Sequence, residues 1–149
     1  MRLLNVTVVA QDPATVREIS VVLNRSLDRE QLDINYFTDP VEALDWILSS
    51  NCDLVITGLE LPVITGLQIT RAAKSCNTHA QVIVLAETMS PSQIDELAEA
   101  GACELLIIPL DKLMLRDLTE QAIARVRRWN KAGRVLEVGG RQKLGILTK

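Results

Sequence analysis

Residues 53–66 read DLVITGLELPVITG, an apolar run of strand length followed by a loop that contains proline and glycine. Near-continuous apolar runs are typical of parallel strands that are covered on both faces. In open α/β proteins the carboxyl end of such a strand borders the ligand crevice. Here that end is Gly58, preceded by Thr57, and it holds no carboxylate, thiol or imidazole. The stretch predicts a central strand whose functional end carries no reactive group.

The rest of the chain alternates strand-like and helix-like patterns. Apolar runs of strand length occupy residues 3–10, 32–37, 52–58, 80–86 and 103–108. Helical patterns follow them near residues 13–28, 40–50, 66–75, 91–100 and 111–132. Capping side chains precede four of these helices, three of them directly before a proline: Asp12, Asp39, Thr65 and Ser90. The sequence therefore predicts five consecutive β-α units.

Five β-α units predict an α/β, doubly wound (βα)5 fold. Its parallel five-stranded sheet would have the order 2-1-3-4-5 and lie between two layers of helices, as a flavodoxin-like three-layer sandwich. The ligand crevice of this fold lies at the carboxyl ends of strands 1 and 3. We therefore expect a candidate site at residues 10–12 and 57–60, with residues 86–87 and 108–109 beside them.

Length and composition predict one domain over residues 1–132. The 149 residues, 48% of them hydrophobic, suffice for one core without disulfides or metal. Cys52, Cys76 and Cys103 lie far apart in sequence, so neither a disulfide framework nor a zinc site is indicated. No run approaches the roughly 20 apolar residues that span a bilayer. We expect a cytoplasmic protein without membrane contact.

Residues 133–149 are predicted to form a C-terminal extension or linker. Two short apolar runs flank Gly139 and Gly140, which is a hairpin signal. A two-stranded hairpin alone is only marginally stable in water. The segment is therefore interpreted as a flexible extension, a linker, or an element that packs against something else.

Charge is distributed unevenly along the chain. Residues 1–115 hold 7 basic and 16 acidic side chains, whereas residues 116–149 hold 9 basic and 3 acidic ones. A basic end suits an acidic partner or complements the carboxyl terminus of a helix. The few arginines, the acidic body and the lack of a helix-turn-helix pattern argue against nucleic-acid binding.

The helix predicted near 111–132 is longer than the sheet requires. About 22 residues span about 33 Å, whereas a six-residue strand covers about 20 Å, so its last turns should project. One apolar stripe runs along it: Leu115, Leu118, Ala122, Val126 and Trp129. The stripe either faces the core throughout, or ends in a partner contact formed by Trp129 with Arg125 and Arg128.

Four stretches at this spacing resemble the receiver domain of two-component response regulators, the CheY-like superfamily, over roughly residues 4–130. NVTVVAQDP looks like the first strand with its acidic loop, and DLVITGLELPVITGLQI like the phosphoacceptor strand with its Pro…Gly-Leu loop. VIVLAE resembles the fourth strand, and EAGACELLIIPL resembles the Gly-Ala…Lys-Pro segment. The resemblance implies a cis peptide bond before Pro109.

The resemblance also implies where phosphoryl chemistry would lie, and the required residues are replaced there. The Mg²⁺-binding acid pair falls on Ala10 and Gln11, and the phosphoaccepting aspartate on Gly58. The hydroxyl that ends the fourth strand falls on Ala86, and the lysine before the proline falls on Ile108. Phosphoryl transfer needs positioning and charge neutralisation around an anionic centre, so the sequence predicts a degenerate site.

Nearby acids are candidates for a cation site but poor substitutes for the lost groups. Asp12 is better explained as the cap of the first helix. Glu60 and Glu87 are expected to face the same crevice, where three acids without a base would repel a phosphate donor. Asp53 lies at the opposite end of its strand. His79, in the loop before the fourth strand, is interpreted as a solvated loop residue.

We therefore predict a non-phosphorylatable pseudo-receiver, without enzymatic activity or cofactor, that acts as a protein–protein interaction module in bacterial signalling. The resemblance implies a partner or output-domain surface, or a homodimer, on the fourth helix, fifth strand and fifth helix. Interaction candidates are Leu105, at the position of the family's switch aromatic, and Arg125, Arg128 and Trp129. The alternative is a small-ligand-binding module that uses the crevice at strands 1 and 3.

Overall fold

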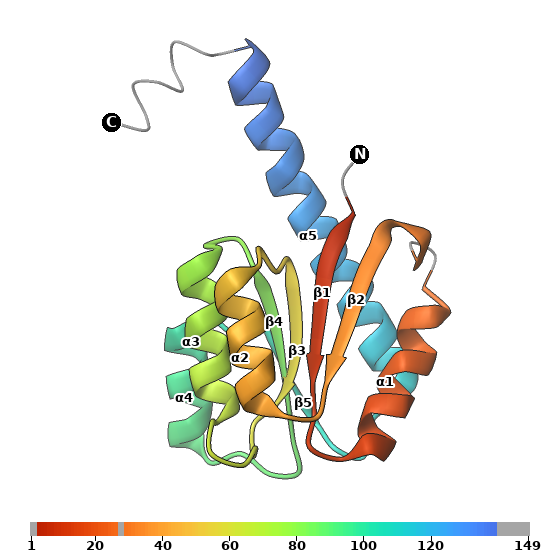
Figure 1. Ribbon diagram of the computed structural model, residues 1–149, viewed down its shortest axis with the longest axis vertical. Helices are drawn as coiled ribbons and strands as arrows, with labels where there is room; N and C mark the ends of the chain where they lie inside the picture. Colours follow the sequence, from red (N-terminus) through yellow and green to blue (C-terminus); the bar gives the residue numbers. More distant parts are fainter. Residues whose placement is uncertain (1–2, 27–28, 140–149) are drawn as a thin grey trace.

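The computed structural model describes residues 3–26 and 29–139, with five parallel strands in the order β2-β1-β3-β4-β5 (Figure 1). The strands are β1 (Leu4–Val9), β2 (Leu32–Phe37), β3 (Leu54–Gly58), β4 (Gln81–Ala86) and β5 (Glu104–Ile107). The helices are α1 (Pro13–Asn24), α2 (Pro40–Ser49), α3 (Gly66–Cys76), α4 (Pro91–Ala100) and α5 (Lys112–Gly139), with a 3-10 turn at Arg29–Gln31. This arrangement confirms the predicted doubly wound fold.

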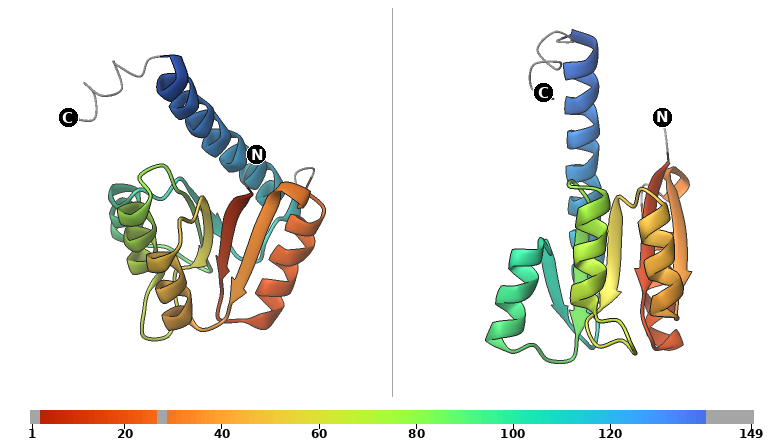
Figure 2. Two further views of the ribbon diagram at one scale, coloured as in Figure 1. Left: turned by 45° about the horizontal axis from the view of Figure 1, so that its top comes forward. Right: turned by 60° about the vertical axis from the view of Figure 1, so that its left-hand side comes forward.

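Two apolar cores hold the three layers together. α1 and α5 pack against one face of the sheet, and α2, α3 and α4 cover the other (Figures 1 and 2). Alternate residues of β3 divide between them: Leu54 and Ile56 enter the α1–α5 core, and Val55 enters the α2–α4 core. Each fully buried aliphatic side chain of this size contributes about 1.5–3 kcal/mol. The continuous apolar runs in the sequence therefore reflect burial on both faces.

Side-chain caps fix where the first four helices begin, as predicted. Asp12 accepts a hydrogen bond from the Ala14 amide at 3.0 Å, and Asp39 accepts one from the Val41 amide at 2.9 Å. α3 and α4 begin with reciprocal capping boxes, Thr65 with Gln68 and Ser90 with Gln93. These bonds satisfy amides that have no partner within the helix.

α1 is shorter than the helix predicted over 13–28. It ends at Asn24, where the amides of Arg25 and Ser26 turn back to the carbonyls of Val22 and Leu23. These bonds span three residues and tighten the last turn, which ends the regular helix.

α5 continues to Gly139, beyond the helix end predicted at 132, so the predicted hairpin is wrong for its first arm. Arg134, Leu136 and Glu137 are good helix formers, no proline interrupts α5, and Gly133 alone costs only about 1 kcal/mol. The second arm, residues 140–149, lies outside the described residues. None of the described helices is long and apolar enough to cross a membrane.

The stripe predicted on α5 faces the core for most of its length. Leu115, Ala122 and Val126 are buried, and Leu118 packs against the same core. Trp129, at the end of the stripe, is 52% exposed. The ten residues after it add about 15 Å of helix, which projects past the sheet (Figure 2).

The β3–α3 loop is compact and locally strained. Val63 has a left-handed φ of 71°, and the Ile64 amide donates to the Pro62 carbonyl at 2.7 Å across it, which forms a γ-turn. A β-branched residue rarely adopts this conformation, and the Val63 side chain is 88% exposed. The loop closes where the Gly66 amide donates to the Leu59 carbonyl at 2.9 Å.

We expect Gly66→Ala to lower the free energy of unfolding by about 2 kcal/mol. A Cβ on Gly66 would lie 2.3 Å from the Gly58 carbonyl oxygen and 2.8 Å from the Leu59 Cα, so backbone must move. Gly58→Ala is the matched control, since its Cβ would make only ordinary van der Waals contacts, with Leu61 Cδ2 at 3.4 Å and the Val9 carbonyl oxygen at 3.9 Å. Urea denaturation of both variants measures the difference, and equal stabilities would contradict the close approach.

Val63→Gly is expected to raise the free energy of unfolding by about 1 kcal/mol. Glycine adopts the left-handed conformation without the steric penalty that valine suffers, which outweighs the greater freedom of the unfolded glycine chain. Val63→Ala retains a Cβ at the same φ and should gain less. Thermal and urea denaturation test this, and a less stable Val63→Gly protein would show that the loop is not strained.

Candidate functional site

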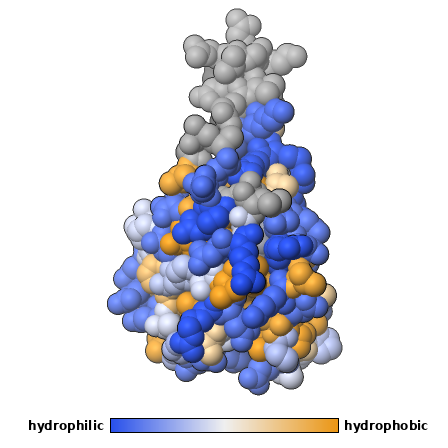
Figure 3. Space-filling view, turned by 90° about the vertical axis from the view of Figure 1, so that its right-hand side faces the viewer, coloured by the Kyte–Doolittle hydropathy of each residue, from blue (hydrophilic) through white to orange (hydrophobic). Residues whose placement is uncertain are grey.

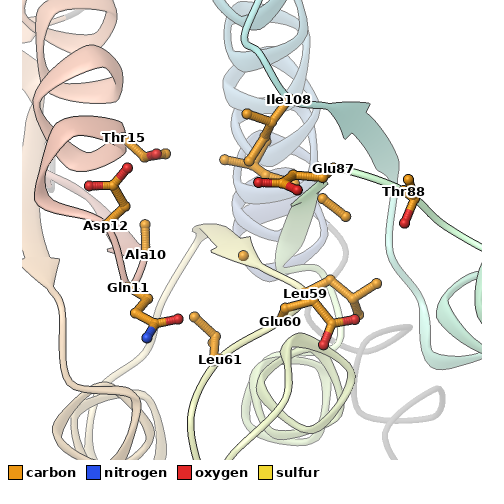
Figure 4. Close-up of a pocket in the computed structure, with 13 residues that line it drawn as sticks. Ala10, Gln11, Asp12, Thr15, Leu59, Glu60, Leu61, Glu87, Thr88 and Ile108 are labelled. Atoms are coloured by element: carbon orange, nitrogen blue, oxygen red, sulfur yellow. The ribbon is translucent and has the colours of Figure 1, made fainter.

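A pocket of about 470 Å³ opens at the carboxyl edge of the sheet, where the sequence predicted a crevice (Figure 4). Its wall comes from the segments that follow β1, β3, β4 and β5. The lining residues are Ala10, Gln11, Asp12, Thr15, Gly58, Leu59, Glu60, Leu61, Leu85, Ala86, Glu87, Thr88 and Ile108. The parallel sheet brings these distant segments together because all its strands end at the same edge.

The five positions predicted to be degenerate all line this pocket. Ala10 and Ala86 are buried and Ile108 is half-buried, so they form an apolar floor, while Gln11 is exposed at the mouth. Gly58 lies at the end of β3 between them. The structure thus brings these five positions together at one edge of the sheet. The peptide bond between Ile108 and Pro109 is cis, as the resemblance implied.

Backbone amides in the floor are already engaged in the sheet. The Ala10 amide donates to the Phe37 carbonyl at 3.1 Å, and the Leu59 amide donates to the Leu85 carbonyl at 2.8 Å. The Ile108 amide donates to the Ala86 carbonyl, also at 2.8 Å. These donors are therefore not free to bind an anion in the pocket.

The three candidate acids lie at the rim of the pocket. Asp12 caps α1, as predicted, while Glu60 and Glu87 are exposed on the loops after β3 and β4. Figure 4 shows Asp12 on the α1 side and the two glutamates across the pocket. Among the described residues, no three His, Cys, Asp or Glu side chains lie close enough together to hold a metal ion. The acids surround the opening without converging on one point.

The space at Gly58 would accept a larger residue. The nearest atom to a Cβ built there is Leu61 Cδ2, at 3.4 Å, which is an ordinary van der Waals contact. Packing therefore does not require glycine at this position.

Thr57 and Asp53, the other polar residues of this region, serve the scaffold. Thr57 is buried and donates to the Gly58 carbonyl at 2.9 Å, and it is not part of the pocket wall. Asp53 lies at the amino edge, where it accepts from the Asn5 amide at 2.9 Å. Neither side chain is part of the pocket wall, and Asp53 lies at the opposite end of its strand, as predicted.

Leu105 and Arg125, two of the predicted interaction residues, are half-buried and therefore less accessible to a partner than expected. Leu105 is half-buried, pairs with Val84 of β4 and packs against the α2–α4 core. Arg125 is half-buried, and its Nε donates to Gln81 Oε1 at 2.8 Å, while its Nη2 is buried without an acceptor. Burial raises the pKa of the nearby Cys103 thiol, and the Arg125 charge is among the effects that oppose the rise. Sequence periodicity could not reveal these tertiary contacts.

Trp129 and His79 form a contact that the sequence did not predict. Their rings stack with centroids 4.1 Å apart and planes inclined by 15°. His79 is exposed, as expected, but its ring is held against α5 rather than free in solvent. Arg128 is exposed beside Trp129 on the same helix. These residues lie near the amino edge, at the opposite end of the sheet from the pocket.

Sequence reasoning placed Leu59 at the site but missed the apolar wall that Leu61 adds beside it, and the hydroxyls of Thr15 and Thr88. The two threonines lie in or next to helix starts, which was the only signal that placed them near the crevice. The leucines reach the pocket because the loop turns back after β3. No local pattern shows that turn.

Comparison with known proteins agrees with this geometry. The family described as "Response regulator receiver domain" matches residues 6–120. "Response regulator MprA" from Mycobacterium sp. (strain KMS) is 32% identical over 110 residues, which cover 72% of this chain and 46% of that protein. The chain thus spans about half the length of the curated relatives it matches.

Solved structures share the fold at low sequence identity. The signal receiver domain of an HD domain-containing protein from Pseudomonas fluorescens Pf-5 superimposes with a TM-score of 0.75 at 18% identity, covering 88% of this chain and 94% of that one. The chemotaxis protein CheY4 of Vibrio cholerae gives a TM-score of 0.68 at 20% identity, over 80% of this chain and 98% of that one. With the family match over most of its length, the chain belongs to the response regulator receiver domain family.

Proposed function

We propose that this receiver domain does not accept a phosphoryl group and acts as a protein–protein interaction module in two-component-type signalling. The observation that carries the proposal is Gly58 at the end of β3, in the pocket, where the resemblance places the phosphoaccepting aspartate. Glycine has no side chain that can attack phosphorus. Thr57 is turned away, so the strand end offers no substitute nucleophile.

The surroundings of Gly58 also lack the groups that would neutralise a phosphoryl centre. The resemblance places a hydroxyl at Ala86 and an ammonium group at Ile108, and both side chains are apolar. Phosphoryl transfer depends on positioning and on compensating the charge that spreads over the oxygens. Glu60 and Glu87 at the rim would repel that charge.

The proposed interaction surface comprises α4, β5 and α5, by resemblance to the family. β5 is an edge strand, and Ile107 on it is 56% exposed, with Ile94 of α4 and Leu113 of α5 also exposed. α4 presents the acids Asp95, Glu96 and Glu99, whereas α5 presents the bases Arg116, Arg128 and Lys131. Opposite charges on neighbouring elements suit a twofold dimer in which α4 of one copy faces α5 of the other.

Acetyl phosphate with Mg²⁺ should leave the intact mass of this protein unchanged. Gln11→Asp, Gly58→Asp, Ala86→Thr and Ile108→Lys together restore four family groups, and the space at Gly58 admits the new Cβ. We expect this restored variant to gain a labile phosphoryl group under the same conditions, which mass spectrometry detects. A phosphoryl group on the unmodified protein would contradict the proposal.

Ile107→Asp should weaken self-association by about tenfold, because it places a charge at the centre of the proposed apolar contact. Val41→Asp on α2, which is 43% exposed on another surface, is the matched control. Trp129→Ala tests whether the far end of α5 takes part. Light scattering over a concentration series measures self-association. Equal self-association of the Ile107→Asp and Val41→Asp variants would exclude the α4-β5-α5 surface as the dimer interface.

A further inference from the structure

We propose that the pocket at the carboxyl edge of the sheet binds an aliphatic di- or polyamine. The proposal concerns a site other than the α4-β5-α5 surface and does not depend on the interaction function. It rests on three properties of the pocket wall: an apolar floor, acids around the opening, and the absence of a basic side chain among the described residues that line it. Together they select a ligand with separated positive charges on an apolar chain.

The floor of the pocket suits methylene groups. Ala10 and Ala86 are buried there. Leu61 and Ile108 complete the apolar surface (Figure 4). A volume of about 470 Å³ lies within the range of small-molecule pockets. A ligand that displaces water from this floor gains the free energy of apolar burial.

The rim of the pocket suits ammonium groups. Asp12, Glu60 and Glu87 come from the loops after β1, β3 and β4, and among the described residues that line the pocket none is Lys, Arg or His. Within the described ranges, no ion pair joins these carboxylates to a basic side chain. Their negative charge is therefore available to a ligand, and Gln11 and two threonine hydroxyls add further acceptors.

The same wall disfavours anions and single metal ions. The amides of Ala10, Leu59 and Ile108 donate within the sheet, so these three are not available to a phosphate or carboxylate. The carboxylates of Glu60 and Glu87 at the rim would also repel an anion. The three acids are too widely spaced to converge on one cation. A polyamine distributes its charges along a chain and can therefore meet separated carboxylates while its methylenes contact the floor.

The test is an NMR titration of the whole protein with spermidine. Amide shifts of Ala10, Ala86 and Ile108 should change together and saturate below about 10 mM. The uncharged 1,8-octanediol, which has a comparable apolar chain, should bind at least about threefold more weakly. Mg²⁺ at the same concentrations should change the chemical shifts of these amides less than spermidine does.

Charge variants make the test specific. Glu60→Gln and Glu87→Gln should each weaken spermidine binding by about threefold, as expected for exposed ion pairs. Glu96→Gln and Glu99→Gln on α4 change the net charge equally and should have no effect. Ile108→Lys, which places an ammonium group in the pocket wall, should weaken binding by at least about tenfold.

Several results would overturn the proposal. Shifts that do not saturate, or that appear on α4 instead of around the pocket, would show general attraction to an acidic surface. If Glu96→Gln and Glu99→Gln weakened spermidine binding as much as the pocket variants, that would also show general attraction to an acidic surface. Saturation by Mg²⁺ at lower concentration than spermidine would identify a metal site instead. Mass spectrometry with acetyl phosphate remains a separate measurement, so failure here leaves the phosphorylation question unaffected.

Discussion

The central constraint on this molecule is that β3 is buried on both faces. Its alternate side chains fill the two cores, and its backbone pairs with β1 on one side and β4 on the other. No surface of the strand is left for chemistry except its carboxyl end. There the chain leaves through Gly58, turns at Val63, and returns to pack Gly66 against the strand end. The position of the pocket follows directly from this packing.

Scaffold and site chemistry are physically separable in this fold. The largest fully buried side chains lie within the sheet and on helix faces, whereas the pocket is lined by residues at strand ends and in the loops that follow them. The small or apolar side chains of Ala10, Ala86 and Ile108 need no hydrogen-bond partner in the pocket wall. The side chains that hold the fold together are thus largely distinct from those that line the opening, so the chemistry of the pocket cannot be inferred from the fold alone.

The first part of α5 packs against the core, and its last part projects beyond the sheet. Up to Val126 it is held by the core, and near its middle Arg125 reaches Gln81 at the start of β4. Trp129 then stacks on His79, and the helix continues past the sheet to Gly139 (Figure 2). The face that carries α1 and β2 is mainly hydrophilic with scattered apolar residues (Figure 3), and apolar residues are also exposed on α4, β5 and the start of α5. α5 thus links the proposed partner surface to the amino edge of the sheet.

The order of elements, the helix starts and the altered positions of the pocket were predictable because they depend on local signals. Apolar runs show burial of strands, Asp-Pro and Ser-Pro pairs mark helix starts, and strand ends in a parallel sheet must meet at one edge. The wide spacing of the cysteines likewise predicted no disulfide framework, and Cys52, Cys76 and Cys103 are free thiols. The family resemblance then assigned roles to Ala10, Gln11, Gly58, Ala86 and Ile108.

Contacts between distant segments were decided only by the tertiary structure. The Trp129–His79 stack, the bond from Arg125 to Gln81 and the inward turn of Leu61 join residues that no sequence period relates. The end of α5 was also misjudged, because two glycines and short apolar runs signal a hairpin only where a partner sheet exists. Sequence determined which side chains must be buried and where helices start, since those are local free-energy differences. Which exposed groups meet, and what shape they enclose, depended on the packing of all the layers at once.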